Sequence, residues 1–208
     1  MTLSRDARWL AAAIQMVIAW EWLVSGTNKV LSGAFPQGLA SALDEGLQNN
    51  PNGWYVSLLQ GIVLPHSVAF GYAIETMEIM VGMALLIGAI VLVGPVRHRG
   101  MPQYRLAVGE IAAATVAALV GMLLCINFHF FMGDGIIPWI NSTRPFDEGI
   151  SLDTLMPPLS AIILVLNARM LVVMTGMPIA QHLRRGVDHL RGLLGGARQR
   201  RPQVADSQ

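Results

Sequence analysis

Residues 67–93 read SVAFGYAIETMEIMVGMALLIGAIVLV and carry only two charged side chains, Glu75 and Glu78. A helix that spans a bilayer needs about 20 consecutive, mostly apolar residues, so this stretch predicts a transmembrane helix. A charged side chain at the bilayer centre costs at least about 2.5–3.5 kcal/mol on insertion scales. We therefore expect both carboxyl groups to face the inside of a helix bundle rather than the lipid.

Three further stretches have a similar length and apolar character: residues 9–31, 105–131 and 155–174. Together the four predict an all-α protein, an integral membrane four-helix bundle. Charged residues make up only 13% of the chain, against about 25% in soluble proteins, which excludes an ordinary soluble domain. The first stretch follows two arginines, as in a signal peptide, but it is too long for one, so we predict a retained helix.

The segment between the first two spans predicts helices at the membrane surface. Apolar residues recur there at every fourth position, namely Phe35, Leu39, Leu43 and Leu47. This is the spacing of one helix face, so we expect a short helix lying on the membrane surface. Residues 54–64 are apolar but too short to span a bilayer. We expect them to be interfacial or re-entrant and to be broken by Pro65.

The chain after the fourth span is rich in arginine. We predict a transmembrane domain over residues 1–176, a basic amphipathic surface helix over 177–194 and a disordered tail over 195–208. The basic residues also predict the orientation. Arginines cluster before the first span, between the second and third, and after the fourth, whereas the other two loops hold only Arg144.

The positive-inside rule therefore places both termini in the cytoplasm. The expected location is a bacterial-type inner membrane, crossed several times. Because the formal net charge is only +1 and no basic stripe contains interleaved aromatic residues, we do not expect nucleic acid as a partner.

The spans contain a small set of ionisable residues. Glu21 and Lys29 are two helical turns apart and share one face, and Glu75 and Glu78 share a face of the second span. Lys29 would reach Glu75 if the two helices pack together, and the pair would lower the cost of both charges. The remaining carboxyl groups could relay protons or hydrogen-bond a ligand. The alternative is that these residues only fix the packing of the helices.

Asn127 and His129 lie near the outer end of the third span, where they could hydrogen-bond a ligand's carbonyl group. The aromatic residues of the first and third spans suit a flat quinone ring, although they suit packing against lipid better. Two outer histidines without a spacing signature are weak support for haem or a metal. Cys125 is the only cysteine, so a Cys-rich metal centre is excluded. The sequence has no haem, metal or nucleotide signature.

Several short motifs resemble the DoxX/DoxD family of four-helix membrane proteins, over roughly residues 10–175. They are Ser25-Gly26-Thr27-Asn28-Lys29, then Phe35 and Gly38-Leu39, then Glu75 to Gly82 with Gly88, and Asn127-Phe128-His129-Phe130. The family includes the membrane subunit of a thiosulfate:quinone oxidoreductase and proteins linked to thiol redox balance. The resemblance implies a quinone-linked or accessory redox role. Lys29, Glu75, Glu78 and Asn127 match the family's polar positions.

Two functions of different kinds remain open, together with a third. The first is a membrane redox subunit in which Glu75, Glu78 and Lys29 manage charge and protons while Glu21, Asn127 or His129 binds a quinone. The second is a non-catalytic accessory subunit of a larger respiratory or photosynthetic complex. The third is a small transporter. Partners expected for the first two are the lipid bilayer and other membrane or periplasmic subunits. Because only the first function is catalytic, enzyme activity is left open.

Overall fold

The computed structural model describes residues 5–48, 50–94, 102–132 and 152–175. The chain divides into two compact units, Met1–Leu171 and Val172–Gln208. All contacts discussed below belong to the first unit. The surface helix predicted over 177–194 and the tail predicted over 195–208 lie outside the described residues.

Every regular element in the described ranges is helical. The four long helices are α1 (Arg5–Ser32), α4 (Ser67–Val93), α5 (Pro102–Phe131) and α6 (Leu152–Thr175). All four are long and apolar enough to cross a membrane, which confirms the predicted all-α membrane fold. The bounds of α4 agree with the prediction, whereas α1, α5 and α6 begin three or four residues earlier than the apolar stretches, because polar residues continue each helix.

The earlier start of α6 changes the setting of its two prolines. Pro157 and Pro158 lie in the second turn of α6, inside the helix rather than in its first turn. A proline has no backbone N–H to donate, so the carbonyl groups of residues 153 and 154 receive no helical hydrogen bond from them. The N-terminal part of α6 therefore has fewer backbone hydrogen bonds than the rest of the helix.

The most extensive helix contact joins α1 and α4. Glycines allow this close approach, because a Cβ on Gly82 would lie 2.7 Å from Leu23 Cγ and one on Gly26 would lie 3.1 Å from Glu78 Cβ. Small residues commonly form such interfaces in membranes, where close packing rather than water exclusion drives association. The contact fixes which residues of the two helices face each other.

An arginine of α1 hydrogen-bonds to the C-terminal end of α4. The guanidinium of Arg8 donates to the carbonyl oxygen of Leu92 from Nε, at 2.8 Å, and to that of Gly94 from a terminal nitrogen, also at 2.8 Å. The last carbonyls of a helix lack helical partners and carry partial negative charge. Arg8 therefore caps α4 from the first turn of α1. We call this end of the bundle the Arg8 end.

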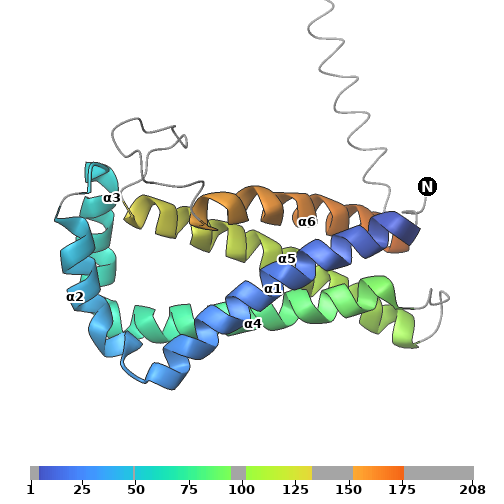
Figure 1. Ribbon diagram of the computed structural model, residues 1–208, viewed down its shortest axis with the longest axis horizontal. Coiled ribbons are helices and arrows are strands. Elements are labelled where there is room, and N and C mark those ends of the chain that lie inside the picture. The colour runs from blue at the N-terminus through green and yellow to red at the C-terminus, as the bar shows by residue number, and fades with distance from the viewer. Residues whose placement is uncertain (1–4, 49, 95–101, 133–151, 176–208) are drawn as a thin grey trace, which may run out of the picture. The chain divides into compact units, whose positions relative to one another are not determined.

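At the opposite end, α2 (Phe35–Leu47) and α3 (Gly53–Leu58) lie next to each other across the bundle (Figure 1). The short helix predicted from the fourfold spacing is confirmed as α2. Its apolar side chains Leu39 and Leu43 are buried in a cluster with Tyr55 and Leu59. The spacing therefore reflects packing against protein, whereas the prediction assigned that face to the membrane surface.

The chain stays helical from α3 into α4 but changes direction between them (Figure 1). A π-helical turn, η1 (Leu59–Val63), precedes a 3-10 turn, η2 (Leu64–His66), that contains Pro65. The N–H of Leu64 donates to Leu59 O, one residue further back than in an α-helix. Because Pro65 has no N–H to donate, the helix is reorganised at the residue where the sequence predicts a break.

Candidate functional site

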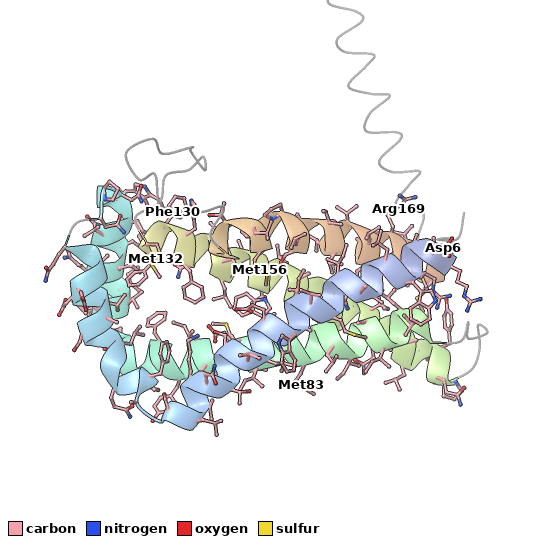
Figure 2. All side chains as sticks on the ribbon, in the orientation of Figure 1. Asp6, Met83, Phe130, Met132, Met156 and Arg169 are labelled. Carbon is pink, nitrogen blue, oxygen red and sulfur yellow. The ribbon has the colours of Figure 1, made fainter. Side chains whose placement is uncertain are left out.

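A cavity of about 510 Å³ lies between the helices, next to α2 and α3. Its walls come from all six α-helices and from η1, and most of the lining side chains are apolar or aromatic. The lining includes Met132, which directly follows α5, and Met156 of α6. Both are labelled in Figure 2. Four polar residues of α1 and α5 bring hydrogen-bonding groups to it: Glu21, Ser25, Lys29 and Asn127.

Lys29 forms an ion pair with Glu78. Its Nζ lies 2.9 Å from Glu78 Oε1 and 2.7 Å from Oε2, and the Glu78 side chain is 0% exposed. The sequence analysis considered Glu75 as the partner of Lys29, but in the structure the partner is Glu78 instead. The Cα–Cβ bonds of a helix point toward its N-terminus, so Lys29 reaches back along α1 toward Gly26, which lies against Glu78.

The ammonium group of Lys29 has a full set of acceptors. Ser25 Oγ accepts a third hydrogen bond from Nζ at 2.7 Å, so the three N–H groups have three oxygen partners. The ring of Phe35 lies 5.3 Å from Nζ, centroid to nitrogen, and adds a cation–π contact. Lys29 is therefore held firmly at the cavity wall, with its charge neutralised by Glu78.

Glu21 lies one turn before Ser25 on the same face of α1 and also lines the cavity. Its side chain makes no hydrogen bond or ion pair with any residue in the described part of the chain. It is partly buried. Glu21 is therefore the carboxyl group of this cavity that is not already paired with a cation.

Asn127 and Tyr55 form a second polar group in the lining. The hydroxyl of Tyr55 lies 2.8 Å from Asn127 Oδ1 and 2.9 Å from the Asn127 carbonyl oxygen. The hydroxyl donates to these oxygens, which orients the side-chain amide. The Nδ2 group of Asn127 has no acceptor among the residues that the structure describes. The sequence analysis described Tyr55 only as part of the interfacial or re-entrant stretch 54–64 and missed this role.

Two predicted site residues lie elsewhere. His129 does not line the cavity, and its Nδ1 lies 3.1 Å from Thr154 Oγ1. Glu75 is buried on the face of α4 that carries Gly71 and Glu78 but is also absent from the lining. The cavity therefore brings together Glu21, Lys29 and Asn127, with Glu78 behind Lys29.

Aromatic rings form much of the wall. Trp22, Phe35, Phe70, Phe128 and Phe131 all contribute to it. In contrast, Trp20 is 70% exposed and faces outward, as expected for contact with lipid. The sequence analysis treated the aromatic residues of the first span as one group, although residues two apart on a helix, such as Trp20 and Trp22, point in different directions.

A separate polar cluster lies nearer the Arg8 end. Gln15 Nε2 donates to Leu85 O at 2.7 Å, and Asn167 Nδ2 donates to Gln15 Oε1 at 3.0 Å. Both side chains are 0% exposed. The sequence interpretation looked for charges and missed this amide cluster. The signal that could have found it is an uncharged Gln or Asn within an otherwise apolar span.

Among the residues described, no group of three or more His, Cys, Asp and Glu side chains is arranged to hold a metal ion. Comparison of the chain with models of protein families, with curated proteins and with solved structures found no match. The resemblance to the DoxX/DoxD family therefore stays a prediction.

Proposed function

We propose that the chain is the membrane subunit of a quinone-linked redox system, and that the quinone binds in the cavity. The observation that carries this proposal is an apolar, aromatic-walled cavity of about 510 Å³ with hydrogen-bonding groups on α1 and α5. Sites for small organic ligands typically have volumes of about 300–1,000 Å³ and a few polar groups in an apolar lining. An apolar ligand dissolved in the bilayer could enter such a site without crossing water.

The residues of the cavity would have distinct tasks. The rings of Phe35, Phe70 and Phe128 would pack against a flat ligand and keep water out. Asn127 Nδ2 would hydrogen-bond an acceptor oxygen of the ligand, and Glu21 would hold a proton close to it. The Lys29–Glu78 pair would keep the wall neutral and rigid. Glu75 and His129 have no task in this scheme, because neither lines the cavity.

A bound quinone would take up two electrons and two protons and leave as the quinol. The sequence has no dinucleotide, Fe–S or haem-attachment motif, so we propose that a partner subunit or a periplasmic donor supplies the electrons. Both termini would be cytoplasmic, in a bacterial-type inner membrane. In this orientation the Arg8 end faces the cytoplasm and the cavity lies toward the periplasmic side.

The test is native purification of the full chain in mild detergent, with mass spectrometry of extracted quinones and of co-purified proteins. The purified protein is then titrated with a short-tailed quinone while tryptophan fluorescence is followed, since Trp22 lines the cavity. Ala42→Phe, which fills the cavity from α2, should abolish quenching. The matched control is Ala113→Phe, because Ala113 is exposed on α5 outside the lining. Absence of quinone binding to the wild-type protein would overturn the proposal.

A second candidate function is a non-catalytic accessory subunit of a larger membrane complex. The observation that favours it is the saturation of Lys29 by Ser25 and Glu78, which is typical of a structural ion pair. The same purification tests it. A stable large complex without quinone attributable to this chain would support the accessory role, and a protein that always purifies alone would contradict it.

A further inference from the structure

Besides the indole Nε1 of Trp22, which is buried beside Gly121 of α5, two side chains of the cavity have a hydrogen-bond donor that no described residue accepts. Ser25 Oγ accepts a hydrogen bond from Lys29, so the hydroxyl proton of Ser25 must point away from Lys29. No oxygen in the described ranges accepts that proton. Asn127 is in the same situation, because Tyr55 donates to its Oδ1 and leaves Nδ2 without an acceptor. Both residues line the cavity.

The orientation of each donor is set by a neighbour. Lys29 is held by two carboxylate oxygens of the buried Glu78, and it therefore occupies the lone-pair side of the Ser25 hydroxyl. Tyr55 belongs to the buried cluster of α2 and α3, so its hydroxyl is equally fixed. Two donors oriented before a ligand arrives cost little entropy when the ligand binds.

The charges around the cavity select against an anionic ligand. Glu78 already neutralises Lys29, the cation among the lining residues, and Glu21 has no cation of its own. An anion would therefore gain no free positive partner, and it would be repelled whenever Glu21 is ionised. A neutral molecule that offers acceptor oxygens to the two donors meets no such cost.

We propose that the ligand is a neutral, flat ring with two carbonyl oxygens, of the benzoquinone or naphthoquinone class, and that Ser25 and Asn127 donate to one carbonyl each. Lys29 and Tyr55 are positioning residues that act through Ser25 and Asn127. This inference rests on the proposed quinone function, and it adds the donors, the charge of the ligand and its two acceptor oxygens.

The test is infrared difference spectroscopy of the full chain with a quinone that carries ¹³C at one carbonyl at a time, together with titrations for Kd. A hydrogen bond lowers the stretching frequency of a carbonyl group, so both labelled bands should lie below their values in an apolar solvent. Ser25→Ala should raise one band and Asn127→Leu the other. Each variant should weaken binding about 3- to 10-fold, the loss of one neutral hydrogen bond.

Three further variants separate donation from structure. Ser25→Thr keeps the hydroxyl and should restore the lowered band. Tyr55→Phe should raise the band that depends on Asn127 and leave the other in place. Ser57→Ala is the matched control, because the Ser57 hydroxyl bonds to Gly53 O within α3 and Ser57 is outside the lining. Its bands and Kd should equal those of the wild type.

The outcomes distinguish this inference from the proposed function. A wild-type protein that binds no quinone overturns both. A wild-type protein that binds quinone, with bands unchanged in Ser25→Ala and Asn127→Leu, overturns the inference alone. Competition by a small inorganic anion such as sulfate, at equal ionic strength, overturns the assignment of a neutral ligand.

Discussion

The bundle contains two polar clusters, and they differ in what lies beside them. In the cluster near the Arg8 end, Gln15 and Asn167 are completely buried and bond to each other and to backbone. In the cluster near α2 and α3, Lys29 and Glu78 adjoin a cavity of about 510 Å³. A polar residue within a membrane bundle is a default candidate for function. Empty space beside a polar cluster is therefore a sharper criterion for a binding site than polarity alone.

Packing explains the difference. Beside Gln15 the helices approach closely, because a Cβ on Gly88 would lie 2.5 Å from both Ala114 Cβ and Gln15 Nε2. Beside Lys29 the chain turns into α2 and α3, which lie across the bundle instead of along it (Figure 1). Large side chains of several helices meet there without filling the space. The first cluster is therefore an architectural contact and the second is a site.

The largest expected effect comes from breaking the ion pair. Lys29→Met should lower the free energy of unfolding in detergent by about 3–5 kcal/mol, because it leaves Glu78 buried and charged without a partner. The measurement is a denaturation curve of the purified protein. The double variant Lys29→Met/Glu78→Leu should recover most of the loss. Wild-type stability in the single variant would mean that the pair contributes nothing.

The next effect tests the close packing near Gln15. Gly88→Ala should lower the free energy of unfolding toward the upper end of the about 1–3 kcal/mol typical of overpacking, since the new methyl group meets Ala114 and Gln15. The matched control is Gly109→Ala, because a Cβ there meets no atom within 4 Å. The control should be neutral or slightly stabilising, and equal losses in the two variants would contradict the packing argument.

A smaller effect is expected from removing an amide. Gln15→Leu should cost about 1–2 kcal/mol, because Asn167 Nδ2 is left buried without an acceptor. Quinone affinity should not change, since Gln15 does not line the cavity. Denaturation and quinone titration on the same preparation check both statements. A change of Kd of tenfold or more in this variant would show that the two clusters are not independent.

The smallest effect on stability should come from Ser25→Ala. Lys29 keeps both oxygens of Glu78, so the free energy of unfolding should fall by no more than about 0.5 kcal/mol, while quinone binding weakens. Ser25→Ala should thus weaken quinone binding with little change in stability, whereas Gln15→Leu should lower stability without changing quinone binding. A loss of stability in Ser25→Ala as large as in Gln15→Leu would remove the distinction between the clusters.

Much of the fold could be predicted from the sequence, because span length and apolar composition are local properties. The α4 bounds were predicted in this way, and the short helix α2 was predicted from the fourfold spacing of its apolar residues. The partner of α2's apolar face was not, because fourfold spacing is the same whether lipid or protein covers it. The interpretation that paired Lys29 with Glu75 compared depths along the two helices. The observed pairing with Glu78 also depends on the direction of the Lys29 side chain and on the contact at Gly26.

The cavity itself could be predicted only in part. Glu21 and Lys29 were found because ionisable groups are conspicuous in apolar spans, and Asn127 was found because it stands beside His129 in Asn127-Phe128-His129-Phe130. The contributions of Ser25 and Tyr55 depend on contacts between residues far apart in the sequence, such as Tyr55 with Asn127. Spacing within one helix carries no information about such contacts. Gln15 and Asn167 were missed for a different reason, because a single uncharged amide in an apolar span carries no charge that requires a partner.

The two residues of the Lys29–Glu78 pair are also synthesised at different times. The partners are 49 residues apart in the chain, and at about 5–20 residues per second the ribosome needs roughly 2–10 s to supply the second after the first. During that interval α1 already exists, and the ammonium group of Lys29 has no carboxylate to neutralise it. Lys29 lies in the last turn of α1, from which a long side chain can extend to the headgroups. The nascent helix can therefore wait in the bilayer with its charge in water until α4 arrives.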